Sequence, residues 1–533
     1  MHPNSKMLRL LTFGLILAPT LASANQCLSR YYESSGPDHP ERMTSLPGWN
    51  QPLPSPWFSG YLDYELDGRQ VHTHYILVLA ETIEESEQDH DEKPLIYWSN
   101  GGPGASSMFG LLTEIGPLVL SEESLKSEDF KSSGIPTPIY NPYAWSRLGH
   151  LLTFDQPAPV GFSYCNDDTV THSCGGMAWT DELTSQNAYL AMQAFFQRFD
   201  CLASTPLYLT GESYAGIYIP TLARRIINDQ ENNKINLRGF AVGDGCLGTE
   251  TSVCGDLSPK GGGAGLFQEF WSIVFMGGHH QIPLKDFHLV MKACAHSNQP
   301  SFLTSDSPQD KECKDVLNKI KQELGGFFEY SLYDECTYNN GLLEGALNDY
   351  PCGGGPIMEE YLKIPIVKDA FHVRSEFFEV DNAGGDFDYT PTEPDLTGFY
   401  QQMNGKLKIL VYNGDTDPSI TSFATANWTS HLGFDEDESW RPWTSDHCKK
   451  MGGYVTRYQG MFDFLTIRGA GHMVPTYKPV ATFAFMKAWI QGSEYPSYDA
   501  NCTKPPTELF LEESKPFHQK SKGRLGASSI MRR

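Results

Sequence analysis

The sequence has little positive charge and no long apolar run, and both shortages exclude classes of function. It has 40 Lys and Arg residues against 65 Asp and Glu residues, a formal net charge of -25. Nucleic-acid binding needs clustered basic side chains, so this balance argues against DNA or RNA as a partner. No apolar stretch reaches the roughly 20 residues that a membrane-spanning helix needs. We therefore expect no nucleic-acid partner and no membrane attachment of the mature chain.

Signatures of metal and nucleotide binding are also missing. The 12 cysteines include no Cys-x-x-Cys pair, and no Cys/His cluster has the spacing of a zinc site. The Gly-rich segment 97–107 lacks the Lys-Ser/Thr ending of a phosphate-binding loop. The sequence thus predicts no metal and no cofactor.

The first residues have the pattern of a secretory signal peptide. Lys6 and Arg9 form a positive flank before the apolar run 10–18, and residues 22–24 read Ala-Ser-Ala, a small-residue cleavage site. This apolar run is too short to cross a bilayer. We interpret residues 1–24 as a signal peptide that is removed from the mature chain.

The cysteines and sequons fit the same route. All 12 cysteines follow residue 24, and in an oxidising compartment an even number of this kind predicts disulfides. Cys165 and Cys174 are close enough to close a small loop, and the pairing of the others is left open. Asn427 and Asn501 begin candidate glycosylation sequons of a eukaryotic protein. We expect the secretory pathway, ending outside the cell or in a lysosome- or vacuole-like compartment.

Short, continuously apolar segments alternate with helical patterns along the chain. Continuous apolarity is typical of strands covered on both faces, as in a parallel sheet. The main predicted strands are LIYW (95–98), LLTF (151–154), LYLT (207–210), GFAV (239–242), KILVY (408–412) and FLTI (464–467). Helices are predicted at 181–199, 214–228 and 479–489. This order predicts an α/β fold with a central, mostly parallel sheet flanked by helices.

The rhythm of strands and helices breaks after the fourth of these strands. The segment that follows carries six cysteines and a Gly-rich turn, which indicates an insertion between two strands of the sheet. We divide the chain into the signal peptide at 1–24, a first part of the core at 25–245, an insertion at 246–400, a second part of the core at 401–495, and a polar, basic, disordered tail at 496–533.

The stretch LYLTGESYAGIYIP at 207–220 places Ser213 between a predicted strand and a predicted helix. Ser213 is either a nucleophile exposed on a sharp strand-to-helix turn or an ordinary helix N-cap. A serine nucleophile needs a histidine base and usually a carboxylate that orients the histidine. In a parallel sheet these groups come from loops at the carboxyl ends of other strands.

Both partners follow at the ends of predicted strands. Asp415 and Asp417 come directly after strand 408–412, and His472 lies in a Gly-rich loop after strand 464–467. The order Ser, Asp, His is that of an α/β hydrolase, so the sequence favours the nucleophile interpretation. The Gly-rich segment 97–107 also follows a strand, and its backbone N–H groups can approach an oxyanion closely.

Five segments resemble motifs of the serine carboxypeptidase family of α/β hydrolases, in the same order. They are WSNGGPGASS, FDQPAPVGFSY, GESYAG, NGDTDP and GAGHMVP. The resemblance covers roughly 57–492 and is weakest in the insertion. It implies the α/β-hydrolase fold with a large cysteine-rich cap before the last strands. It also implies a peptidase that releases C-terminal amino acids from peptides and proteins through an acyl-enzyme.

The resemblance assigns a role to each matching residue. Ser213 would be the nucleophile, His472 the general base, and Asp417 the triad acid, with Asp415 as the alternative. The oxyanion would be bound by the N–H groups of Gly102 and Tyr214. The substrate carboxylate would be bound by Asn100, Gly101, Glu114 and Glu212.

Two glutamates beside a substrate carboxylate have a physical consequence. Adjacent negative charges repel, so the site works only if the carboxyls share protons. We expect Glu212 to have a raised pKa and to donate a hydrogen bond as an acid. Substrate binding should then be favoured at acidic pH and weaken as the pH rises through neutrality.

The sequence departs from the family pattern in places that limit the inference. Ala105 stands where many members have Cys, and VGDGCLG at 242–248 replaces a more usual Gly-Asn-Pro, so the start of the insertion is uncertain. Specificity does not carry over, because the insertion shapes the pockets in this family. Alternative functions are an acyltransferase with the same triad, a general serine esterase, or a secreted binding or protective protein with a vestigial site. A homodimer is compatible with the sequence.

Overall fold

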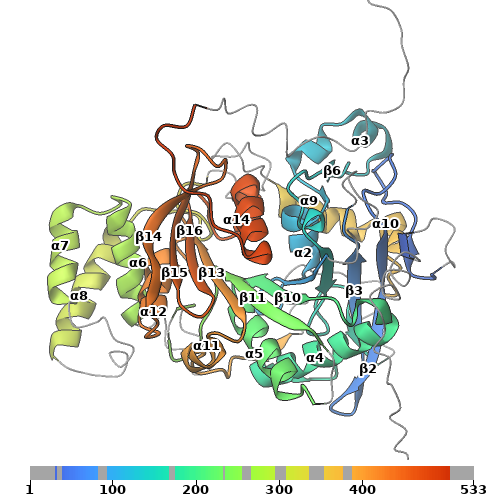
Figure 1. The fold of residues 1–533 in the computed structure, drawn as a ribbon, viewed down its shortest axis with the longest axis horizontal. Helices are drawn as coiled ribbons and strands as arrows, with labels where there is room; N and C mark the ends of the chain where they lie inside the picture. The colour runs from blue at the N-terminus through green and yellow to red at the C-terminus, as the bar shows by residue number, and fades with distance from the viewer. Residues whose placement is uncertain are drawn as a thin grey trace, which may run out of the picture.

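One 12-stranded sheet runs through the molecule, with helices on both of its faces (Figure 1). The computed structural model describes residues 31–32, 39–81, 93–166, 174–231, 235–251, 253–254, 266–294, 308–334, 353–375 and 387–503. The predicted signal peptide and the tail from residue 504 onward lie outside these residues. In spatial order the strands are β1 (Arg42–Met43), β2 (Trp57–Leu66), β3 (Arg69–Val78), β7 (His150–Phe154), β4 (Leu95–Ser99), β10 (Leu207–Glu212), β11 (Leu237–Gly243), β13 (Lys408–Gly414), β16 (Phe462–Ile467), β15 (Met451–Tyr458) and β14 (Glu436–Thr444), and β8 (Tyr164–Cys165) pairs with β3.

The middle of the sheet is parallel and both of its sides are antiparallel. The strands from β7 across to β16 pair in parallel with their neighbours. The strands β1, β2 and β3 on one side, and β15 and β14 on the other, are antiparallel. The predicted central, mostly parallel sheet is confirmed. The sequence did not predict β14 and β15, which lie between β13 and β16 in the chain.

Two apolar cores lie on opposite faces of the sheet and explain why its strands are continuously apolar. Tyr97 of β4 packs into one core and its neighbour Trp98 packs into the other. In β13, Val411 and Tyr412 divide between the two cores in the same way. Because successive side chains of a strand point to opposite faces, a strand covered on both faces needs apolar residues throughout.

The helices separate into the same two layers. One face carries helices from the middle of the chain, α4 (Asp181–Arg198), α5 (Ala215–Asn228), α11 (Thr397–Met403) and α12 (Ser422–Ser430). The other face carries α2 (Met108–Gly110), α9 (Gly354–Lys363), α10 (Pro365–Ala370), α13 (Val474–Tyr477) and α14 (Pro479–Gln491). The helices predicted at 181–199, 214–228 and 479–489 therefore differ from α4, α5 and α14 only at their ends. Smaller elements are β5 (Leu118–Val119), α3 (Glu128–Ser133) and β6 (Ile139–Tyr140).

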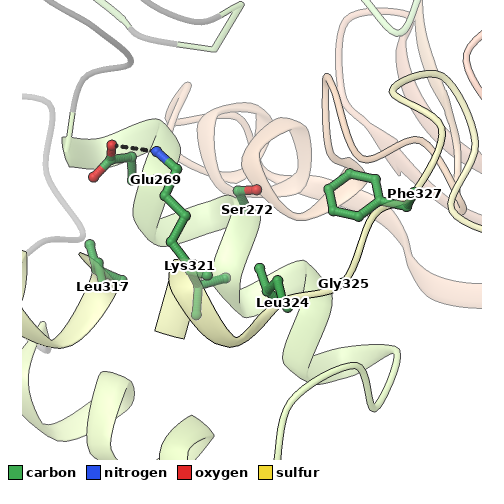
Figure 2. A pocket seen from close by; sticks show the side chains of 8 residues that line it. Glu269, Ser272, Leu317, Lys321, Leu324, Gly325 and Phe327 are labelled. Atoms are coloured by element: carbon green, nitrogen blue, oxygen red, sulfur yellow. Dashed lines mark hydrogen bonds and ion pairs between the residues drawn. The ribbon is translucent and has the colours of Figure 1, made fainter. Parts of the chain in front are cut away.

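Between β11 and β13 the chain leaves the sheet and builds a helical unit with a core of its own. Helices α6 (Leu266–Gly278), α7 (Leu284–Ala293) and α8 (Pro308–Glu323) pack around this core, and Phe275 of α6 contacts Phe423 of α12. A pocket of about 280 Å³ lies between α6 and α8, with the Glu269–Lys321 ion pair at 3.0 Å on its lining and Phe327 opposite (Figure 2). None of its lining residues belongs to the predicted active site. Further along, β12 (Asp388–Thr390) pairs in parallel with β9 (Ala178–Thr180).

Disulfides close local loops and join the last described residues to the sheet. The bridges are Cys165–Cys174, Cys246–Cys254, Cys294–Cys313 and Cys448–Cys502. The predicted small loop at 165–174 is confirmed. Within the described residues no cysteine is free. In the same part of the chain, no helix combines the length and apolarity needed to cross a membrane.

We expect Leu209→Ala to destabilise the fold strongly, because Leu209 is fully buried in the middle strand β10. Truncating such a side chain leaves a cavity and costs about 2–5 kcal/mol of unfolding free energy. The matched control is Leu284→Ala at an exposed position of α7, which should change the unfolding free energy by less than about 0.5 kcal/mol. Denaturant unfolding of both variants measures the difference, and equal costs would contradict the assignment of the core.

Candidate active site

Ser213 stands on a sharp turn between β10 and α5. Its φ is +64°, a conformation that non-glycine residues rarely adopt and that is typical of a nucleophile presented at a strand-to-helix turn. Hydrogen bonds made by the backbone of Ser213 hold the turn. Its N–H donates to Gly243 O at 3.0 Å, and its carbonyl accepts from Cys246 N at 3.0 Å. The N-cap of α5 is Tyr214, with no side-chain capping bond. The alternative that Ser213 caps this helix is therefore wrong.

The Gly-rich loop after β4 lies directly against this turn. A Cβ on Gly101 would come 2.3 Å from the backbone nitrogen of Tyr214 and 2.8 Å from Ser213 Cβ. Only glycine allows the two backbones to approach so closely. The adjacent Gly102 is exposed and has a φ of +103°. The structure thus brings both residues with predicted oxyanion N–H groups, Gly102 and Tyr214, to the neighbourhood of Ser213.

His472 and Asp417 form a buried hydrogen-bonded pair. The ring nitrogen Nδ1 of His472 lies 2.7 Å from Asp417 Oδ2, and both side chains are at most 5% exposed. Asp417 Oδ1 also accepts the N–H of Ser419 at 2.8 Å, which fixes the carboxylate. With Nδ1 as the donor, Nε2 is the ring nitrogen that can accept a proton. The tautomer follows from the acceptor-only carboxylate beside Nδ1.

Asp415 faces a different partner. Its Oδ1 accepts the N–H of Gly469 at 2.6 Å and so joins the turn after β13 to the loop after β16. The sequence left Asp415 and Asp417 open as triad acids. Because Asp417 holds the hydrogen bond to His472, the geometry favours Asp417.

Asn100, Glu114 and Glu212 meet on the other side of the turn, all buried. Asn100 Nδ2 donates to Glu212 Oε1 at 2.9 Å and to Glu114 Oε1 at 3.3 Å. Its Oδ1 accepts from Trp98 Nε1 and Gly110 N, each at 2.9 Å, so the amide can point its NH₂ group only towards the carboxyls. Glu114 is carried by the single π-helical turn at 111–115, a rare conformation that is common at functional sites.

Burial makes this pair of carboxyls difficult to ionise. Burial and the nearby charge of Glu114 raise the pKa of Glu212 well above its ordinary range. Burial also raises the pKa of Glu114, to about 7, against the opposing effect of its hydrogen bond from Asn100. One oxygen of each carboxyl, Oε2, is buried without a partner among the described residues. These two atoms are free to share a proton or to receive a ligand.

A further carboxyl, which the sequence interpretation missed, lies beside the histidine. Atoms of Asp244, Asp417 and His472 lie within 4.8 Å of one another. This set resembles metal ligands, but His472 and Asp417 already bond to each other, and Asp244 accepts from Asn413 Nδ2 at 3.0 Å. We therefore assign a hydrogen-bonded network here. Asp244 follows strand β11, so the strand-end rule that selected Asp417 and His472 would have found it.

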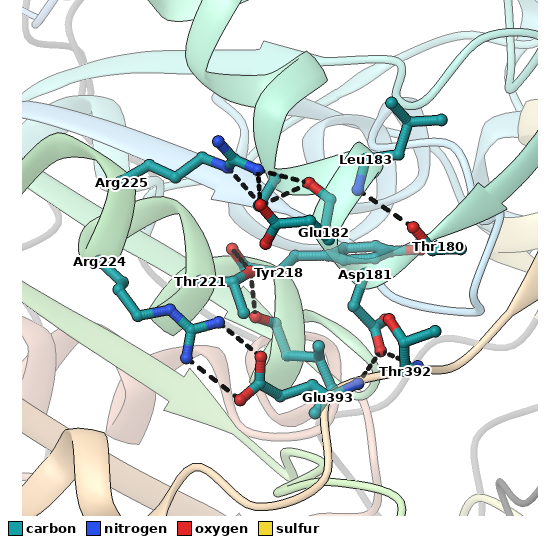
Figure 3. Close-up of polar contacts among 12 residues, drawn as sticks. Thr180, Asp181, Glu182, Leu183, Tyr218, Thr221, Arg224, Arg225, Thr392 and Glu393 are labelled. Carbon is teal, nitrogen blue, oxygen red and sulfur yellow. Dashed lines mark hydrogen bonds and ion pairs between the residues drawn. The ribbon is translucent and has the colours of Figure 1, made fainter. Parts of the chain in front are cut away.

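Asp181 is a second residue that was missed. Its Oδ1 accepts the hydroxyls of Tyr214 and Tyr389 at 2.7 Å each. Its Oδ2 accepts the N–H groups of Thr392 and Glu393 at 2.5 and 2.6 Å (Figure 3). All four donors lie far from Asp181 in the sequence. The carboxylate therefore fixes the residue after the predicted nucleophile to the segment that leads back from the insertion to the sheet. Its only local signal was a Thr-Asp pair before a helix.

Comparisons with known proteins agree with this arrangement. A protein-family model described as serine carboxypeptidase matches residues 47–492. The chain is 29% identical over 524 residues to the lysosomal protective protein of Mus musculus, covering 90% of this chain and 98% of that protein. It is 25% identical over 520 residues to serine carboxypeptidase 1 of Hordeum vulgare, covering 85% of this chain and 93% of that protein.

A solved structure supports the fold independently. Kex1Δp, described as a prohormone-processing carboxypeptidase from Saccharomyces cerevisiae, is similar over 84% of this chain and 94% of that chain, with a TM-score of 0.63 and 20% identity. The family match spans most of the 533 residues and includes every predicted site residue. The chain therefore belongs to the serine carboxypeptidase family and is a serine-type carboxypeptidase with the α/β-hydrolase fold.

Proposed function

We propose that this enzyme releases single amino acids from the C-termini of peptides and proteins through an acyl-enzyme formed on Ser213. The observation that carries the proposal is the buried pair Glu114 and Glu212, bridged by Asn100 and lying next to the Ser213 turn. A general esterase or amidase has no need of such a pair. A peptidase that accepts only free C-termini needs a site that recognises a carboxylate.

The proposed chemistry follows from the order of the groups around the turn. His472 Nε2 takes the proton of the Ser213 hydroxyl as the oxygen attacks the last peptide carbonyl, and Asp417 stabilises the imidazolium that results. The N–H groups of Gly102 and Tyr214 stabilise the oxyanion. His472 then gives the proton to the leaving amine, which departs as a free amino acid. Water, activated by the same histidine, hydrolyses the acyl-enzyme and restores Ser213.

The pair Glu114 and Glu212 recognises the substrate carboxylate by donating a hydrogen bond to it. Below the raised pKa values, Glu212 carries a proton and can donate a hydrogen bond to the substrate carboxylate, while Asn100 Nδ2 adds a second donor. As the pH rises through the pKa of Glu114, about 7, the site gains negative charge next to a negative substrate. Binding should then weaken, so activity on peptides is favoured at acidic pH.

The cellular setting is proposed from the same features. The disulfides fit an oxidising compartment, and the N-terminal pattern predicts entry into the secretory pathway. We propose a secreted or a lysosome- or vacuole-like location, with peptide and protein C-termini as substrates. An acidic compartment of this kind would match the protonation that the carboxylate pair requires.

The central test compares a peptide with a free C-terminus and the same peptide with a C-terminal amide. We expect kcat/KM for the free acid to exceed that for the amide by at least about 100-fold, because the amide leaves the buried carboxyls without their charged partner. Ser213→Ala should lower kcat by roughly 10⁶-fold. Equal rates on both peptides would indicate an esterase or a broad amidase, and ester products formed from an added alcohol in preference to hydrolysis would indicate an acyltransferase.

The choice of the triad acid is tested by two neighbouring substitutions. Asp417→Asn should lower kcat by about 10⁴-fold, since an amide cannot hold the His472 ring in the reactive tautomer. Asp415→Asn serves as the matched control, because an amide oxygen can still accept the N–H of Gly469. The control should stay within about tenfold of wild type. The opposite ranking of the two variants in peptide assays would make Asp415 the triad acid.

The role of the carboxylate pair is tested through the pH dependence of KM. Glu212→Gln keeps a hydrogen-bond donor but has no proton to lose, so KM at pH 5 should stay near the wild-type value. The rise of KM above pH 7 should become shallower in this variant. Glu81→Gln is the matched control, because Glu81 is also a buried carboxyl with a raised pKa but bonds to Tyr140 and Ser146. A KM profile unchanged by Glu212→Gln would refute this account of binding.

A further inference from the structure

Asp244 is held rigidly at the end of β11. It is fully buried, and its φ of +42° is unusual for a residue with a side chain. Its N–H donates to Tyr412 O at 2.8 Å. Its Oδ1 accepts from Asn413 Nδ2 at 3.0 Å, and the N–H of Gly414 is shared between Oδ1 at 3.1 Å and Oδ2 at 3.2 Å. Because these partners belong to the neighbouring strand β13, the carboxyl cannot turn away from the active site.

This carboxyl lies against the pair that forms the acid and base of the proposed triad. Atoms of Asp244, Asp417 and His472 lie within 4.8 Å of one another in a buried place. Asp417 uses one lone pair of Oδ2 for His472 and one of Oδ1 for the N–H of Ser419, so further lone pairs are left to accept a bond.

Two carboxylates cannot both be ionised here without compensation. Burial, followed by the charge of Asp417, raises the pKa of Asp244 well above its ordinary range. Glu212 at the end of β10 acts in the same direction when it is ionised, and the phenol of Tyr412 in β13 faces the same groups. In the part of the chain that the structure describes, no Lys or Arg forms an ion pair with Asp244. Like charges this close disfavour ionisation of both carboxyls, so we expect one of the two to hold a proton.

We propose that Asp244 is a protonated positioning residue of the active site, whose carboxyl donates a hydrogen bond to Asp417 and holds it in line with His472. The proposal rests on the roles of Asp417 and His472 in the proposed function. A neutral donor at this point orients Asp417 without adding a second charge beside the base. It also makes Asp417 a weaker proton acceptor, so the proton that His472 takes from Ser213 stays on the imidazole.

The test uses Asp244→Asn and Asp244→Ala with an uncharged ester substrate, whose binding does not involve the carboxylate pair. Asparagine can accept the bonds from Asn413 and Gly414 and still donate Nδ2–H to Asp417, whereas alanine can do neither. We expect the acid limb of kcat/KM against pH to stay within about 0.3 pH unit of wild type in Asp244→Asn, because the charge is unchanged. We expect kcat of Asp244→Ala to be at least about tenfold lower than that of Asp244→Asn.

Other results would overturn the proposal. If Asp244 were ionised, removing its charge so close to His472 would move the acid limb down by about one pH unit or more in Asp244→Asn. Equal kcat for the two variants would exclude a positioning bond. If Asp244→Ala fails to fold, the acid limb of Asp244→Asn decides alone. The proposed function is checked separately, because Ser213→Ala must abolish ester hydrolysis whatever the result at Asp244.

Discussion

Buried negative charge is the constraint on which this candidate active site depends. Glu114, Glu212, Asp244 and Asp417 are all buried, and His472, the proposed base, is buried with them. Moving an uncompensated carboxylate out of water is so costly that a group shifts its pKa before it ionises. The raised pKa values of Glu114, Glu212 and Asp244 favour their protonated forms, so the four acids need not all be charged together. In the proposed mechanism Asp417 is the carboxylate that stabilises the imidazolium of His472.

The close approach of backbones is the second requirement, and it depends on the parallel sheet. Strands β10, β11, β13 and β16 end side by side, so the residues that follow them reach one small region. The turn at Ser213 is held by backbone bonds to Gly243 and Cys246, at the end of the neighbouring strand. The Gly-rich loop can lie against this turn only because Gly101 has no side chain. The strands thus fix the N–H groups of Gly102 and Tyr214, the proposed oxyanion donors, before any substrate binds. Electrostatic stabilisation of a transition state requires donors that are fixed in advance.

Local sequence patterns predicted the parts of the fold that are locally determined. The six central strands were visible because burial on both faces requires continuous apolarity, and their order with the helices predicted the α/β class. The strands β14 and β15 were not predicted, because β14 is largely exposed and polar and lacks continuous apolarity. Strand pairing at an edge depends on the neighbour β16, which local sequence does not reveal.

The same division applies to the site. Ser213, Asp417 and His472 could be selected because each follows a predicted strand and the order of the three is informative. Asp415 and Asp417 could not be separated, since both lie in one turn and the backbone of that turn decides which reaches His472. Asp181 was out of reach of any local rule, because its four donors come from 33 to 212 residues away.

The segment between β11 and β13 contacts the candidate active site directly. The N–H of His472 donates to Tyr330 O at 2.8 Å, and the Tyr330 ring stacks on the imidazole with centroids 4.9 Å apart. Phe387 lies against Gly104 of the Gly-rich loop, and Tyr389 bonds to Asp181. These residues lie in the segment between β11 and β13, where the chain leaves the sheet. His472 and the turn at Ser213 therefore both depend on contacts with this segment. Tyr330 holds the backbone and ring of His472, and Tyr389 shares Asp181 with Tyr214, so this segment positions both sides of the candidate active site.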